Sequence, residues 1–196
     1  MVDTVYMETV RSLRDELVSA GVELLEAAGA SGVSLRAITR RAGVSHGAPR
    51  RYFPTHNALL AAIAVEGFSD LAVRLRPSLD GSSVPARDRL VALGIAYVEF
   101  ARDRPAMFEL MFRHDLLEGA GENLRATTLP LFAALHGLVE DASNDTDAGD
   151  RALAIWVSLH GTAVLVANRS LQLVAGDAVL EGLVGRVIGA HLVPPT

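Results

Sequence analysis

The chain has 196 residues, of which 50% are hydrophobic, so it can bury one compact core or a small module fused to a larger one. It contains no cysteine, which excludes disulfides, thiolate metal sites and a cysteine nucleophile. Its formal net charge is −5, so any attraction to a polyanion must come from a local basic cluster.

The ends and the apolar runs of the chain bear on its location. The N-terminal residues show no basic segment followed by an apolar core, so no secretory signal is predicted. The longest apolar run, 152–167, contains His160 and falls short of the roughly 20 residues that span a bilayer. We therefore expect a buried helix there and a soluble, cytoplasmic protein with no membrane partner.

Charge divides the chain into two unequal parts. Residues 1–56 carry seven arginines against six acidic residues, whereas the remainder carries eleven against seventeen. Residues 34–56 alone hold five arginines, two histidines and no acidic residue. This division predicts two domains with different electrostatic roles, over residues 1–54 and 55–196.

The basic part has the spacing of helices. Apolar residues at steps of three and four predict a helix over about 10–28. Ser34 is a good N-cap for a short helix over 35–42, and Gly43 suits the left-handed residue that closes it. Ser45 is the expected N-cap of a further helix ending near Phe53. Pro49 would be its fourth residue and would lose one hydrogen bond, which predicts a tight or shifted first turn.

The rest of the chain is also predicted to be helical. Thr55 is the expected N-cap of a long helix that runs to about residue 76, and 79–85 reads as a linker. No sustained alternation or hairpin signal indicates a strand. The fold class is therefore all-α with about nine helices, the last five over 86–104, 105–113, 124–140, 150–172 and 177–192.

Two short helices joined by "AGVS" and preceded by a long helix form a helix-turn-helix. On the outer face of the second short helix we expect His46, Gly47, Arg50 and Arg51. Gly47 permits close approach of the backbone, and the free N–H groups at the helix start, beyond Ser45, suit a phosphate. The motif predicts binding to double-stranded DNA.

The stretch "VSLRAITRRAGVSHGAPRRYFPTHNALLAAI" closely resembles the N-terminal domain of the TetR family of bacterial transcriptional repressors, over about residues 10–65. The resemblance implies a homodimer that binds a palindromic operator and releases it when a small ligand enters the C-terminal domain. It also implies backbone contacts from Ser34, Tyr52 and His56. Arg50 replaces the usual aromatic residue and His56 the usual Lys, so Arg50 is open to a phosphate or a base contact.

The C-terminal part resembles the WHG-type subfamily in "AYVEFARDRPAMFELMFR" and "WVSLHGTAVLV". Aromatic and methionine side chains recur there at helical spacing, which is typical either of core or of a pocket for a hydrophobic or amphipathic effector. For His160 a structural hydrogen bond and a place in the pocket or subunit interface both remain open. The candidate ligand-binding residues are Phe68, Tyr97, Phe100, Met107, Phe108, Met111, Phe112, Trp156 and His160.

The last two helices are apolar and rich in glycine, at Gly161, Gly182, Gly185 and Gly189. Small residues let helices approach closely, so we expect these helices to pack against a two-fold copy in a four-helix bundle, as the family also implies.

Two other functions fit the sequence less well. A small helical-bundle enzyme acting on an apolar substrate would use His160, or His114 with Asp115, as acid and base, but no recognisable constellation accompanies them. The second alternative is a scaffold that binds DNA and has no effector. No ligand spacing for a metal occurs, so we expect no catalytic residue, metal or cofactor.

Overall fold

The computed structural model describes residues 12–45, 47–80, 83–143, 147–176 and 180–192, and these residues form helices and no strand. The elements in chain order are α1 (Leu13–Ala28), the short 3₁₀ helix η1 (Ala30–Gly32), α2 (Leu35–Ala42), α3 (Ala48–Tyr52), α4 (His56–Leu79), α5 (Ala86–Asp103), α6 (Pro105–Met111), α7 (His114–Leu117), α8 (Leu124–Ser143), α9 (Ala148–Ala167), α10 (Ser170–Ala175) and α11 (Leu180–Leu192). The all-α prediction is confirmed. The described residues contain eleven α-helices rather than about nine, because α7 and α10 were not expected.

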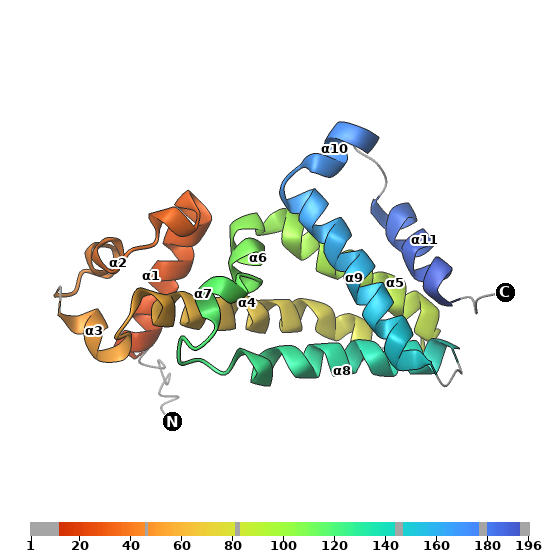
Figure 1. Ribbon diagram of the computed structural model, residues 1–196, viewed down its shortest axis with the longest axis horizontal. Helices are drawn as coiled ribbons and strands as arrows, with labels where there is room; N and C mark the ends of the chain where they lie inside the picture. Colours follow the sequence, from red (N-terminus) through yellow and green to blue (C-terminus); the bar gives the residue numbers. More distant parts are fainter. Residues whose placement is uncertain (1–11, 46, 81–82, 144–146, 177–179, 193–196) are drawn as a thin grey trace, which may run out of the picture.

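Helices α1–α3 lie at one end of the molecule, and α4 runs from them toward the other end, alongside α8 (Figure 1). With 24 residues, α4 is about 36 Å long. It packs on α1 near its start and on α5, α6 and α8 further along. This one helix therefore joins the basic unit to the larger bundle.

Helix ends follow local hydrogen bonding. The hydroxyls of Ser34 and Thr55 accept from the backbone N–H groups of Ala37 and Ala58 at 3.1 and 3.0 Å, so both predicted N-caps are confirmed. Helix α1 begins in a capping box, in which Ser12 and Asp15 each bind the other's backbone N–H. Its predicted start at residue 10 lies outside the described residues.

One core runs through the whole molecule. It includes Leu17 and Ile38 from the basic unit, Ile63 on α4, and Val98 and Ile155 in the larger bundle, all fully buried. Helix α6 approaches α4 closely at Gly67, where a β-carbon would lie 2.5 Å from the Met107 sulfur. The N-terminal helices and the bundle are thus packed as neighbours and not only tethered.

Helix α9 is apolar on more than one face. It is the one described helix long and apolar enough to cross a membrane by length and composition alone, a test that a core helix of a soluble protein also passes. Only 28% of its most apolar window is buried within the chain, since Leu153, Val157, Val164 and Leu165 are exposed. Helix α9 therefore leaves part of its apolar surface exposed.

Candidate DNA interface and ligand pocket

Helices α2 and α3 form the predicted helix-turn-helix. Gly43 closes α2 with φ 69° and ψ 25°, the left-handed conformation expected of it, and its N–H binds the carbonyl of Thr39. Val44 follows with a hydrogen bond to the same carbonyl at 3.1 Å. Behind the turn, Ile38 is fully buried in contact with the core, which fixes α2 against α1.

Helix α3 begins later than predicted. It starts at Ala48 with Gly47 as N-cap, so Ser45 lies in the connection and caps nothing. Pro49 is the reason: inside a helix it would lose a hydrogen bond and clash with a preceding carbonyl, whereas in the first turn its missing N–H is not needed. The shift expected at Pro49 is confirmed. His46 lies outside the described residues.

Arg50 and Arg51 lie on the exposed surface of α3. Among the described residues neither has a hydrogen-bond or ion-pair partner. Arg41 differs, because its Nε donates to Glu23 of α1 at 2.7 Å. Glu23 of α1 thus brings a carboxylate to the basic stretch, although residues 34–56 contain none themselves. Arg50 and Arg51 are the arginines of α3 whose charge is unpaired among the described residues.

Of the other predicted DNA contacts, Tyr52 is exposed, whereas His56 and Ser34 make hydrogen bonds within the chain. Tyr52 is 44% exposed at the end of α3. His56 is exposed, yet its Nε2 lies 2.7 Å from the carbonyl oxygen of Val33. A carbonyl only accepts, so Nε2 is the donor in this contact and carries a proton. Ser34 keeps its exposed position, with its hydroxyl engaged as N-cap.

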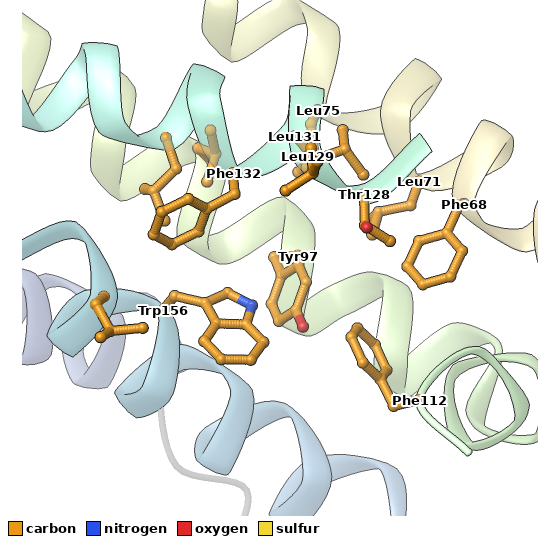
Figure 2. A pocket seen from close by; sticks show the side chains of 13 residues that line it. Phe68, Leu71, Leu75, Tyr97, Phe112, Thr128, Leu129, Leu131, Phe132 and Trp156 are labelled. Carbon is orange, nitrogen blue, oxygen red and sulfur yellow. The ribbon is translucent and has the colours of Figure 1, made fainter. Parts of the chain in front are cut away.

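An apolar cavity of about 320 Å³ lies in the larger bundle. Side chains from α4, α5, α8 and α9 and Phe112 surround it, with Tyr97 at its centre (Figure 2). The volume is at the lower end of the range for small-molecule sites. The lining residues are Phe68, Leu71, Leu75, Leu93, Tyr97, Phe112, Thr128, Leu129, Leu131, Phe132, Leu135, Leu153 and Trp156.

A second cavity, of about 480 Å³, is lined by residues of α6 and α9 and by Phe112. Its lining consists of Pro105, Ala106, Phe108, Glu109, Phe112, His160, Val164, Ala167 and Asn168. Phe112 is thus shared by both cavities. Its ring centroid lies 5.7 Å from that of Phe68 and 4.4 Å from that of His160.

The structure places six of the nine candidate ligand residues beside these cavities. Phe68, Tyr97 and Trp156 line the first, Phe108 and His160 the second, and Phe112 both. The other three, Phe100, Met107 and Met111, are buried and line neither cavity.

None of the candidate residues lies on α8, so the sequence missed the whole wall that α8 contributes to the first cavity. Thr128, Leu131, Phe132 and Leu135 recur at three and four residues, and this periodicity was visible. It does not distinguish a cavity wall from core.

Tyr97 and His160 form the polar centre of the aromatic cluster. The phenolic oxygen lies 2.9 Å from Nδ1 of His160. Burial raises the pKa of Tyr97, and the indole N–H of Trp156, which points toward the Tyr97 oxygen in Figure 2, offsets part of the rise. Burial lowers the pKa of His160, so its ring is neutral near pH 7. Because the Trp156 N–H already donates to the phenolic oxygen, we assign the Tyr97 O–H as the donor to Nδ1, which leaves the proton of the His160 ring on Nε2.

We expect acid to destabilise the fold through His160. Its pKa is lowered in the folded state, so the unfolded chain binds a proton first as the pH falls below about 6.5. The contribution of the neutral ring is complete above that pH and declines below it. Urea unfolding across pH should show a shallower acid loss for His160→Gln than for the wild type. Parallel pH profiles of the two proteins would contradict this assignment.

An ordered helix-turn-helix with exposed arginines, joined by one long helix to a bundle with an apolar cavity, defines the class of helix-turn-helix transcriptional regulators. Two family models match the chain: "Bacterial regulatory proteins, tetR family" over residues 17–63, and "Tetracyclin repressor-like, C-terminal domain" over residues 90–187. The chain belongs to the TetR family, as its sequence motifs indicated. This family is a class of regulators and not of enzymes.

Known proteins resemble this chain in sequence and in structure. The HTH-type transcriptional regulator Rv1816 of Mycobacterium tuberculosis is 32% identical over 107 residues, which cover 52% of this chain and 46% of that relative. A protein of unknown function from Rhodococcus sp. RHA1 has a similar structure, with a TM-score of 0.79, 30% identity and 97% of each chain covered. The regulator FadR from Bacillus subtilis, in complex with stearoyl-CoA, shares the fold at a TM-score of 0.66 and 15% identity, over 90% of this chain and 96% of that one.

Proposed function

We propose that the protein is a dimeric, cytoplasmic, ligand-responsive repressor that binds a palindromic operator. The observation that carries this function is the exposed face of α3, where Arg50 and Arg51 have no partner among the described residues. Unpaired guanidinium groups on a helix-turn-helix suit phosphate and guanine edges. The proposed domains are residues 1–54 for DNA and 55–196 for ligand and dimer.

On the operator, α3 would enter the major groove. His46 and Gly47 then lie closest to the base edges, while Ser34, Ser45, Tyr52 and His56 face the sugar-phosphate backbone. Two copies of α3 about 34 Å apart would read successive half-sites on one side of the duplex.

The partner in the dimer would be a second copy packed on α9 and α11. Leu153, Val157, Gly161 and Leu165 form one exposed stripe on α9 at four-residue spacing. Helix α11 packs beside α9, where His191 accepts from Arg151 through its carbonyl and contacts Ser158 through Nε2 at 2.9 Å. Regulators of this family dimerise, and a two-fold copy would cover the open face.

The effector would occupy the cavity around Tyr97. Its walls are apolar, and Tyr97, Thr128 and Trp156 are the lining residues that add polar atoms. FadR, which shares the fold, is in complex with stearoyl-CoA, a molecule with a long apolar acyl chain, and this supports the proposal. A hydrophobic or amphipathic molecule is accordingly the class of effector that we propose.

Ligand binding would reach the DNA-binding unit through α6. Phe112 borders both cavities just after the last residue of α6, and Arg104 lies just before its first. Arg104 Nε donates to Glu26 of α1 at 2.8 Å, and its Nη1 donates to Asp70 of α4. A displacement of α6 by ligand would therefore be transmitted to α1 through the contact between Arg104 and Glu26.

We expect Arg104→Ala to uncouple the two sites. Operator and ligand should each still bind, but the weakening of operator binding by ligand should shrink by about 0.5–2 kcal/mol. Arg102→Ala is the matched control, because Arg102 pairs with Glu99 and Asp103 within α5. Fluorescence anisotropy of labelled operator, with and without ligand, measures the coupling. An unchanged ligand response in Arg104→Ala would remove this route.

The function itself is tested by DNase I protection on duplexes selected by the protein. Protection of a palindrome that is relieved by an apolar ligand supports the repressor. Protection that no ligand of a hydrophobic library relieves would leave DNA binding without the proposed response and contradict that part.

A further inference from the structure

The two cavities are almost free of charge. The thirteen residues that line the first include none that carries a charge near neutral pH. Of the nine that line the second, Glu109 is the charged one, and its side chain is 71% exposed. No arginine lines either cavity among the described residues, although every basic residue of the printed sequence is an arginine.

The linings of the two cavities meet at Phe112, which lies among other aromatic rings. Phe112 follows the last residue of α6 and is only partly buried. The ring centroids of Phe112 and Phe108 lie 5.0 Å apart, and those of Phe112 and His160 lie 4.4 Å apart. Phe112 is the one described residue in both linings, and its ring neighbours Phe68 of the first lining and His160 of the second, so we infer that a rotation of this side chain connects the two cavities.

The lining of the second cavity offers hydrogen-bond donors. His160 uses Nδ1 to accept from Tyr97, and its Nε2 has no partner among the described residues. Because the ring lines the second cavity, we infer that its remaining N–H is a donor for a ligand there. Asn168 is a second one: its Oδ1 accepts from the backbone N–H of Ser170 at 2.9 Å, which leaves the amide N–H groups for a ligand.

We propose that the effector is an uncharged amphipathic molecule, whose apolar body fills the cavity around Tyr97 and whose carbonyl or hydroxyl oxygen reaches His160 past Phe112. The proposal rests on the proposed function and specifies the chemistry of its ligand.

Charge is what separates this class from its alternatives. An anionic head would lose its hydration, and the described lining of neither cavity contains a cation to compensate; Arg113 lies 3.9 Å from Glu109 but lines neither cavity. A cationic head would find Glu109 only at the exposed rim. A neutral oxygen loses little on burial and regains one hydrogen bond.

The single tryptophan of the chain, Trp156, lines the first cavity, so its fluorescence reports binding without DNA. We would titrate methyl decanoate, decanoate and decyltrimethylammonium, well above the ordinary carboxyl pKa of about 4. Methyl decanoate should bind at least about tenfold more tightly than either charged probe. Equal or tighter binding of a charged probe would overturn the proposal.

The position of the head is tested with His160→Phe, which keeps a ring and removes the donor. Its affinity for methyl decanoate should fall about threefold to tenfold, while its affinity for decane stays unchanged. Exposed His114, outside both linings, provides the control His114→Gln. Thermal melting verifies that each variant is folded. Unchanged affinity for the ester in His160→Phe would contradict the placement.

The two levels of the proposal fail differently. If no probe changes the Trp156 fluorescence, the effector pocket of the proposed function is contradicted together with this inference. If decanoate binds best and relieves operator binding, the regulator stands and only the uncharged class of ligand is wrong.

Discussion

Replacing Arg51 with Ala should lower operator affinity about tenfold for each protomer, and so about a hundredfold for a dimer. The reason is that Arg51 is exposed on α3 with no ion-pair partner among the described residues, so its charge is available to a phosphate. Fluorescence anisotropy across a salt series should also show a slope of log affinity against log salt that is smaller by about two, one for each lost contact.

The matched control is Arg76→Ala. Arg76 is an exposed arginine in the last turn of α4, with no side-chain partner among the described residues and far along the sequence from α3. Arg76→Ala removes the same charge as Arg51→Ala but outside the proposed DNA contact. It should therefore leave the salt slope nearly unchanged. If the slopes of Arg51→Ala and wild type agree, Arg51 does not contact phosphate.

The same experiment assigns Arg50. A phosphate contact predicts that Arg50→Ala weakens binding to every duplex alike, whereas a guanine contact predicts a loss of about 1–3 kcal/mol confined to sites with that guanine. Affinities for a set of duplexes with single base changes separate the two outcomes.

A charge placed in the apolar stripe of α9 should separate the dimer. Val157 is 56% exposed in the middle of this stripe, so Val157→Glu would place two carboxylates in one apolar interface. Sedimentation equilibrium should show monomers. Operator affinity should fall about 10²–10⁴-fold, because the two half-sites would no longer be bound by one linked particle.

Val73→Glu is the control for this change. Val73 is 58% exposed on α4, outside α9 and α11, so it tests the cost of the same substitution at equal exposure. We expect Val73→Glu to remain dimeric. A stable Val157→Glu dimer would show that the subunits meet on another surface.

Local signals in the sequence predicted the helix ends that depend on local hydrogen bonds. Ser34 and Thr55 cap their helices and Gly43 adopts the left-handed conformation, since each needs only its neighbours in the chain.

Where other parts of the fold decide, the predictions were less accurate. The helix expected over 150–172 breaks after Ala167, and Arg169 takes a positive φ of 62° before α10 begins. The apolar run does end at residue 167, but three polar residues, 168–170, can also lie within a continuous helix, so the end of the run did not by itself predict the break.

The candidate site was predictable to the extent that its residues are chemically distinctive. Tyr97, Phe112, Trp156 and His160 attracted attention as aromatic groups and lie at the cavities. Met107 looked equally suitable, yet it packs against Gly67 of α4. Whether an apolar residue borders a cavity or fills the core depends on packing between helices, which spacing along one helix does not encode.

The most direct test of the account is selection of duplexes by the purified protein from a random-sequence pool, followed by anisotropy titration of the enriched sequence across a salt series. The account predicts a palindromic sequence, bound selectively and with a steep salt dependence by two or four protomers. A pool that shows no enrichment, with weak binding indifferent to sequence, would contradict the assignment of α3 as a reader of DNA.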